Sequence, residues 1–145
     1  MKKSFVILGF IVFIIPAMGA QKKPVSAKQQ KPDKVSLERG EKVYANNCLA
    51  CHQVDGSGVP RLNPPLIKTK WVLGDKKQLI NIIVKGMNEE IEIDGEFYSN
   101  TMPAHDHLTD QQVADVSTYI RNSFGNKASG VTVAEVKATR TKVKS

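Results

Sequence analysis

The sequence has few aromatic residues for a chain of 145 residues. It contains one tryptophan and three tyrosines, and beyond the first 20 residues its only phenylalanines are Phe97 and Phe124. This length allows one ordinary domain, of which roughly 90 residues have the patterns of ordered structure. Domains of that size with few large side chains often need a covalent staple or a cofactor to complete the core. We therefore expect something bulky and apolar to fill the centre of the fold.

The sequence also lacks an apolar run long enough to cross a membrane comfortably. Its most apolar stretch is 5–15, which follows two lysines and precedes the small residues of 16–20. This pattern is typical of a secretory signal peptide, so we expect residues 1–20 to direct export to the periplasm or another extracytoplasmic compartment. An uncleaved membrane anchor is the alternative. No cysteine directly follows the run, which argues against a lipid-anchored lipoprotein.

A basic face suited to nucleic acid is missing as well, although the formal net charge is +7. Residues 21–35 carry +4 and residues 128–145 carry +3, whereas residues 36–127 have 10 basic and 12 acidic side chains. Nucleic-acid binding normally needs Lys and Arg clustered on a folded surface. We therefore expect no nucleic-acid partner. The terminal lysines are suited instead to attract an acidic protein surface or anionic lipid, which would allow a membrane-surface association.

The charge distribution and composition divide the chain into four segments. After the signal, residues 21–35 are rich in Lys, Gln and Pro and predict a flexible linker. Residues 36–127 carry the apolar periodic patterns and form the expected domain. Residues 128–145 are a basic C-terminal tail, in which Thr132 and Glu135 have the spacing of a capping box. A short helix and a disordered tail are both open there.

Three helices and one hairpin are predicted within the domain. Ser36 can cap a helix that runs into Cys48, and Asp75 and Gln78 form a capping box for a helix that ends at Gly86. A further capping box begins the last helix, which Gly125 closes; its residues are Thr109 and Gln112, and its apolar side is Val113, Val116, Ile120 and Phe124. Between these helices Ile91 and Ile93 alternate with polar residues before Asp94 and Gly95, which predicts a small β-hairpin.

Both cysteines lie in one short stretch, "NNCLACHQV", where His52 directly follows Cys51. Two thiols two residues apart can add to the two vinyl groups at one edge of a haem, and the following histidine is then held beneath the iron. C-x-x-C-H is the attachment pattern for c-type haem. Two other interpretations compete, namely a zinc site and a redox disulfide.

The competing interpretations have weaker support in the surrounding sequence. A structural zinc site needs four ligands, and His105 and His107 are the available pair beyond the two thiols. These histidines are one residue apart, which is closer than the usual spacing of three to five residues. A redox disulfide normally lies at the start of a helix that follows a strand, whereas here the helix precedes Cys48 and a Gly/Pro-rich loop follows His52.

A second axial ligand is expected at Met102, in "YSNTMPAH", fifty residues beyond His52. Pro103 stiffens its loop. A thioether opposite a histidine raises the reduction potential of the iron, the usual arrangement for electron transfer. Met87 is the competing ligand, and a methionine is otherwise core material. His105 and His107 are expected mainly as polar surface residues ahead of the last helix.

These residues together resemble class I cytochromes c, the small monohaem electron carriers, over about residues 36–126. The resemblance rests on Gly40 and Tyr44 before the attachment motif, on "NPPL" at 63–66, and on "MPAHDHLTDQQVADVSTYIRNSFGN". It implies an all-α cytochrome c fold, with three main helices around one covalently bound haem and a small β-hairpin insertion. Val116 and Tyr119 resemble the residues that meet Gly40 and Tyr44 where the first and last helices cross.

The resemblance also implies the site residues and the function. One haem c per chain would be bound through Cys48 and Cys51, with His52 and Met102 as iron ligands. The carbonyl of Pro64 would accept the ring N–H of His52, and Trp71 would direct its indole N–H to a haem propionate. The implied function is one-electron transfer without catalysis, between redox partners such as a dehydrogenase and a terminal oxidase. Two alternatives remain open: a haem subunit of a larger complex, and a gas-binding or peroxidase-like haem protein with a labile methionine.

Overall fold

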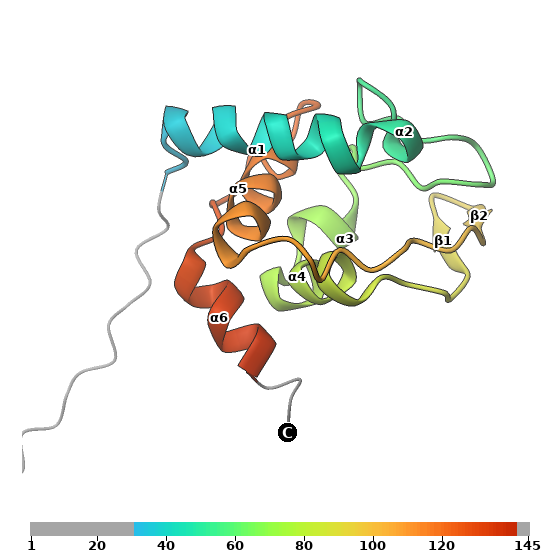
Figure 1. Cartoon of the computed structure of the whole chain (residues 1–145). Helices are drawn as coiled ribbons and strands as arrows, with labels where there is room; N and C mark the ends of the chain where they lie inside the picture. Colours follow the sequence, from blue (N-terminus) through green and yellow to red (C-terminus); the bar gives the residue numbers. More distant parts are fainter. Residues whose placement is uncertain (1–30, 142–145) are drawn as a thin grey trace, which may run out of the picture.

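The computed structural model describes residues 31–141, so the expected signal and most of the expected linker lie outside the described part. The helices are α1 (Lys34–Asn47), α2 (Leu49–His52), α3 (Lys70–Leu73), α4 (Lys76–Lys85), α5 (Asp110–Ile120) and α6 (Val133–Thr141). Strands β1 (Ile91–Ile93) and β2 (Glu96–Tyr98) form an antiparallel hairpin, in which Glu92 pairs with Phe97. The mostly helical fold with a two-stranded hairpin confirms the predicted fold class (Figure 1).

Helix α1 begins three residues earlier than predicted. Its N-cap is Asp33, whose carboxylate accepts a hydrogen bond of 2.8 Å from the backbone N–H of Ser36. The expectation that Ser36 caps this helix is therefore wrong. The hydroxyl of Ser36 instead donates to the carboxylate of Asp115 on α5, at 2.7 Å, and so joins the two helices.

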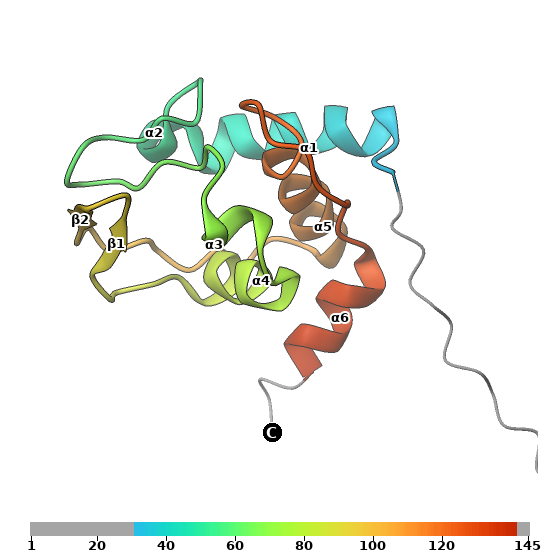
Figure 2. The same ribbon diagram turned by 180° about the vertical axis from the view of Figure 1, so that it is seen from behind.

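Helices α1 and α5 cross closely, and both views show α1 lying over α5 (Figures 1 and 2). A Cβ at Gly40 would collide with the backbone carbonyl of Asp115 and with Cβ of Tyr119, so only glycine permits this approach. Beside it the rings of Tyr44 and Tyr119 lie 5.5 Å apart between centroids. The predicted meeting of Gly40 and Tyr44 with Tyr119 is confirmed.

A buried carboxylate on α5 ties the crossing together. Asp115 is 2% exposed and accepts hydrogen bonds from Arg39 Nε at 2.6 Å and from Gln111 Nε2 at 3.1 Å, in addition to Ser36. Burial alone would raise the pKa of Asp115, but these hydrogen bonds and the charge of Arg39 outweigh it and lower the pKa. The carboxylate is therefore ionised at neutral pH and fully partnered.

Helix α4 and the hairpin follow the sequence pattern. Asp75 is the N-cap of α4 and accepts from the N–H of Lys77, and the left-handed Gly86 follows the last residue. Asp75 caps the helix through its own side chain alone, and the capping box expected with Gln78 is not formed. The hairpin turns at Asp94 and Gly95, both of which have positive φ, and it buries Ile91 and Ile93 on one face.

Helix α5 starts as predicted and ends early. Thr109 and Gln112 form the expected capping box. The helix stops at Ile120, whose carbonyl accepts from the side-chain amide of Asn126 at 2.7 Å. The C-cap is Arg121, whose guanidinium turns inward to donate to the carbonyls of Val72, Gly74 and Ser129. The expectation that Gly125 closes the helix is wrong, since Gly125 belongs to a separate turn.

The segment expected as a basic tail contains α6. Of the short helix and the disordered tail that the sequence left open, the structure has the helix. Thr132 and Glu135 form the predicted reciprocal cap, with the Thr132 N–H donating to the Glu135 carboxylate at 2.7 Å. Val136 is fully buried, and Lys76 on α4 lies 3.0 Å from Glu135. Thus α6 packs on the rest of the fold, at the end farthest from the hairpin (Figures 1 and 2). Within residues 31–141, no helix has the length and apolar character needed to span a membrane.

Candidate functional site

The attachment motif sits at a bend between two helices. Helix α1 ends at Asn47, Cys48 leaves helical geometry with φ of −121°, and the four-residue helix α2 carries Cys51 and His52. Cys48 is partly buried and Cys51 is exposed, and the two thiols are not joined to each other. The bend places one thiol inside the fold and the other at its surface.

His52 is held in one orientation. It is 8% exposed, and its ring Nδ1 lies 2.9 Å from the carbonyl oxygen of Pro64, the contact expected from the sequence. A carbonyl only accepts hydrogen bonds, so Nδ1 carries the hydrogen and Nε2 keeps its lone pair. Burial lowers the pKa of His52, although the bond to Pro64 opposes that shift. The neutral imidazole with a free Nε2 is the form that binds metals.

Two adjoining cavities open beside this histidine, with empty volumes of about 620 and 590 Å³. The two cavities together are here called the cleft, and each is a lobe of it. Six residues line both lobes: Cys48, His52, Pro64, Met87, Ile91 and Met102. The first lobe is walled by apolar side chains, among them Leu66, Val72, Leu79, Ile82, Ile83 and Ile93. The second is more polar and includes the exposed Cys51, together with Asn63, Asn100 and Thr101.

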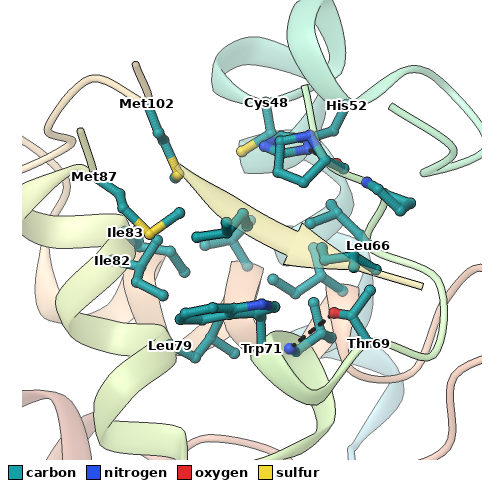
Figure 3. Close-up of a pocket in the computed structure, with 17 residues that line it drawn as sticks. Cys48, His52, Leu66, Thr69, Trp71, Leu79, Ile82, Ile83, Met87 and Met102 are labelled. Atoms are coloured by element: carbon teal, nitrogen blue, oxygen red, sulfur yellow. Dashed lines mark hydrogen bonds between the residues drawn. The ribbon is translucent and has the colours of Figure 1, made fainter. Parts of the chain in front are cut away.

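Met102 lies across the cleft from the attachment motif, and its thioether points into the space between them (Figure 3). Met87 lies next to it and points into the same cleft. Met87 and Met102 exchange two backbone hydrogen bonds of 2.9 Å in an antiparallel bridge. The two methionines that the sequence offered as rival ligands are therefore neighbours.

Trp71 contributes a polar group that has no partner within residues 31–141. Its indole Nε1 is buried, lines the apolar lobe of the cleft and makes no hydrogen bond there. Unpartnered buried donors are rare, because leaving one unsatisfied costs about 1–3 kcal/mol. The ammonium of Lys70 lies 5.7 Å from the centre of the Trp71 ring. A donor and a nearby positive charge are suited to an anionic acceptor.

His105 is buried, and the expectation that it is a polar surface residue is wrong. Its Nδ1 lies 2.9 Å from the carbonyl of Pro103, and its Nε2 lies 3.1 Å from the carbonyl of Asn47. The ring therefore bridges the loop after Met102 and the end of α1. His107 is exposed, and its ring stacks on that of His105. The sequence pattern could not predict this contact, because Asn47 and His105 are 58 residues apart.

The other two interpretations of the cysteines have little support in this geometry. Within the described range, no three His, Cys, Asp or Glu side chains gather to hold a metal ion, and both ring nitrogens of His105 face backbone carbonyls. Burial, followed by the neighbouring Cys51, raises the pKa of the Cys48 thiol to about 11. Reactive thiols of C-x-x-C redox motifs have lowered pKa values instead.

The model of the cytochrome c family matches residues 37–124, which is more than half of the chain. The chain belongs to the cytochrome c family. The predicted resemblance is thereby confirmed, and membership implies electron transfer with a covalently bound haem c, with which the C-x-x-C-H motif agrees. The cleft fits such a group: an apolar lobe suits a flat macrocycle, two thiols and an imidazole form one wall, and the unpartnered Trp71 N–H suits an anionic edge.

Relatives of the chain are cytochromes of different sizes. Cytochrome c-552 of Thermus thermophilus is 34% identical over 112 residues, which cover 71% of this chain and 85% of that protein. The cytochrome c subunit of the quinone alcohol dehydrogenase of Gluconobacter oxydans is 35% identical over 105 residues, but these cover 22% of that subunit. Subunit CcoP of the cbb3-type cytochrome c oxidase of Azospirillum brasilense is 28% identical over 110 residues, 34% of its length. The chain thus spans most of one relative and a minor part of the other two.

Proposed function

We propose that this cytochrome is a periplasmic one-electron carrier with a single haem c. Cys48 and Cys51 would hold the haem by thioether bonds, and His52 and Met102 would bind its iron. The protein has no catalytic residues of its own in this proposal. The observation that carries it is the pairing of a buried His52, oriented by Pro64 at 2.9 Å, with a thioether pointing in from the far side of the same cleft.

Haem, when bound, supplies an iron that takes up and releases one electron. The residues of the chain set the conditions for that exchange. The Nδ1–H of His52 donates to Pro64, which fixes the ring and strengthens Nε2 as an electron donor. The thioether of Met102 favours ferrous iron and a high potential. The apolar side chains of the first lobe keep water away, which acts in the same direction.

The polar lobe is the proposed route by which electrons leave. Cys51 is exposed there, and the loop and hairpin on either side are joined by the Asn100 amide, which donates to Asn63 at 2.8 Å. Electron transfer requires close approach and forms no bond between partners. The interfaces between redox partners are usually small, and the complexes are transient. A redox partner therefore needs only a brief contact at this edge.

Optical spectra test the proposal directly. The protein, matured in the periplasm of an expression host, is recorded oxidised, reduced, and reduced with carbon monoxide, and a denatured alkaline pyridine sample reports thioether-linked haem. We expect covalent haem, the long-wavelength thioether–iron band in the oxidised form, and no carbon monoxide binding. Ready binding of carbon monoxide would instead indicate an open sixth position and a gas-binding or peroxidase-like protein. Absence of haem would instead favour a zinc site or a redox disulfide at the two cysteines.

A haem subunit of a larger complex is the second candidate. It is favoured by the relatives named as subunits of a dehydrogenase and an oxidase, of which this chain covers 22% and 34%. The two candidates differ in assembly. A free carrier elutes as a monomer from solubilised membranes and soluble fractions of its own cell, whereas a subunit co-elutes with a dehydrogenase or oxidase activity.

Export and charge complete the proposal. The pattern of residues 1–20 supports a periplasmic location, which N-terminal sequencing of the mature protein tests. The C-terminal lysines are proposed to attract acidic partners or anionic lipid. Deleting 128–145 would also remove the buried Val136, so the better test replaces Lys137, Lys142 and Lys144 with glutamine. A salt dependence of reduction by a native partner that matches the unmodified protein would refute the role of these charges.

A further inference from the structure

Met87 and Met102 occupy opposite positions of one antiparallel bridge. Each backbone N–H donates to the carbonyl of the other residue at 2.9 Å. In such a hydrogen-bonded pair the two Cα atoms are about 5.5 Å apart, and the two side chains project to the same face. The same face here is the cleft, since both residues line both of its lobes. The cleft thus contains two thioethers at nearly the same place.

The bridge is held from both of its ends. Gly86 has a φ of +75°, and a Cβ there would collide with the carbonyl of Met102, so glycine lets the ligand loop lie directly against the end of α4. On the same side of the bridge the N–H of His105 donates to the carbonyl of Ile83 at 3.0 Å. Beyond the opposite end, Ile91 pairs with Tyr98 in the hairpin. The backbone of both methionines is therefore fixed, whereas their unbranched side chains have three rotatable bonds each.

We propose that Met87 is a second thioether donor, which takes the sixth position of the haem iron when Met102 no longer occupies it. The inference rests on the proposed function, because it assumes a haem with His52 as the other ligand. The exchange replaces one neutral sulfur lone pair by another, so it needs no proton and no change in charge. Figure 3 shows both sulfur atoms on the side of the cleft that faces His52.

Three variants and the native protein form the test, with each methionine replaced by leucine alone (M102L, M87L) and both together. Leucine keeps the apolar volume and removes the sulfur. The chain has two further methionines, Met1 and Met18, and both belong to the expected signal, so the mature protein offers these two thioethers. The readouts are the thioether–iron band, carbon monoxide titration of the reduced protein, and the ε-methyl resonances of ¹³C-labelled methionine.

The inference predicts that M102L keeps the thioether–iron band and one strongly shifted methyl resonance, both of which disappear in the double variant. If Met87 occupies the iron in about nine molecules of ten, M102L binds carbon monoxide about tenfold more weakly than the double variant does. M87L alone keeps the thioether–iron band, because Met102 remains the ligand. Should M102L fail to mature, M102A is the replacement, because it leaves Met87 more room.

Three results would overturn the inference, and they differ from failure of the proposed function. Equal carbon monoxide affinity in M102L and the double variant means that Met87 does not reach the iron. A low-spin M102L without the thioether band means that a nitrogen donor replaces Met102 instead. Loss of the band in M87L means that Met87 is the resident ligand. If the native protein itself lacks the band, the His/Met proposal fails first. Far-UV circular dichroism and the pyridine assay confirm that each variant is folded and loaded.

Discussion

The two halves of this molecule are stabilised in different ways. In the crossing half, made of α1, α5 and α6, side chains of the chain itself meet: Tyr44 packs on Tyr119, and Asp115 is partnered by Arg39 and Ser36. In the cleft half, made of α2 to α4, the hairpin and residues 99–105, apolar side chains surround a cavity of about 620 Å³. The crossing half resembles the core of any small helical domain, whereas the cleft half is arranged around its cofactor.

This difference indicates where the missing core material lies. The shortage of aromatic residues is not spread over the fold, because Tyr44, Tyr119 and Phe124 gather beside the crossing with ring centroids 5.3 to 5.8 Å apart. The cleft has Trp71, with its N–H unpartnered among residues 31–141. A haem would complete both the apolar contacts and the hydrogen bond. Stability should therefore depend on haem much more in one half than in the other.

Preventing haem attachment should separate the halves most strongly. In the C48S/C51S variant, we expect amides of α4, the hairpin and the Met102 loop to lose protection from hydrogen exchange by at least about a hundredfold, a loss of roughly 3 kcal/mol. Amides of α1 and α5 should lose less. Hydrogen exchange with mass spectrometry on both proteins measures this. Equal loss throughout would show that the halves do not differ in their dependence on haem.

The next largest effect is expected from disrupting the close contact between α1 and α5. Gly40→Ala places a Cβ against the carbonyl of Asp115, and we expect the free energy of unfolding of the haem-loaded protein to fall by about 3 kcal/mol. Helix propensity acts in the opposite direction and favours alanine by about 1 kcal/mol, so the sign of the change is informative. Denaturant titration followed by circular dichroism gives the value. Ala45→Ser, on an exposed face of α1, should stay within about 0.5 kcal/mol of the native protein.

The bridge between the halves can be weakened at His105. His105→Leu removes the hydrogen bond that the ring N–H donates to one of the carbonyls of Asn47 and Pro103, and we expect the free energy of unfolding to fall by about 2 kcal/mol. The Met102 loop should also be released more readily, so the thioether–iron band should disappear at a lower denaturant concentration than the helical signal. His107→Leu is the matched control, because His107 is exposed and should change little. Similar losses in both variants would remove the special role of His105.

A change at Asp115, with an expected effect similar in size to that at His105, tests the electrostatics of the crossing half. Asp115→Asn should lower the free energy of unfolding by about 2 kcal/mol at pH 7, since hydrogen bonds to a charged group are lost. Because the pKa of Asp115 is lower in the folded than in the unfolded state, its contribution is complete above the unfolded value of about 3.9. It is lost as the pH falls through the folded pKa.

Native and variant stabilities should therefore converge in acid, which denaturant titrations between pH 7 and pH 3 measure. The exposed pair of Arg61 and Glu96 provides the control, as Glu96→Gln should have almost no effect at any of these pH values. A gap between native and Asp115→Asn that stays constant down to pH 3 would mean that the hydrogen bonds do not depend on the charge.

Local patterns predicted the parts of the fold that depend on neighbouring residues. The Thr109–Gln112 box, the turn at Asp94 and Gly95, and the end of α4 at Gly86 are each specified within a few residues of sequence, and all are found. The capping box expected at Asp75 and Gln78 is also local, and it is not formed. Other wrong predictions involve residues whose partners lie far away in the chain. The hydroxyl of Ser36 pairs with Asp115 rather than capping a helix, and Arg121, at the early end of α5, donates to the distant carbonyl of Val72.

The site divides in the same manner. The attachment motif and Met102 have short sequence signatures. The resemblance to cytochromes c supplied Pro64, whose carbonyl lies beside His52 as expected, and Trp71, whose propionate contact stays a prediction. The pairing of Met87 with Met102 and the bridge made by His105 have no local signature. Both depend on how the end of α4 and the end of α1 meet the ligand loop, which only the folded chain brings together.

The contact between Ser36 and Asp115 also has a consequence for the order of folding events. These residues are 79 positions apart, and the whole cleft half lies in the loop that their contact closes. Closing a loop of that length costs conformational entropy once, and the cost grows only slowly with length. Contacts so distant in sequence slow folding. Joining α1 to α5 is thus the step that confines everything between them, and a haem already bound to Cys48 and Cys51 would enter the fold as part of the chain.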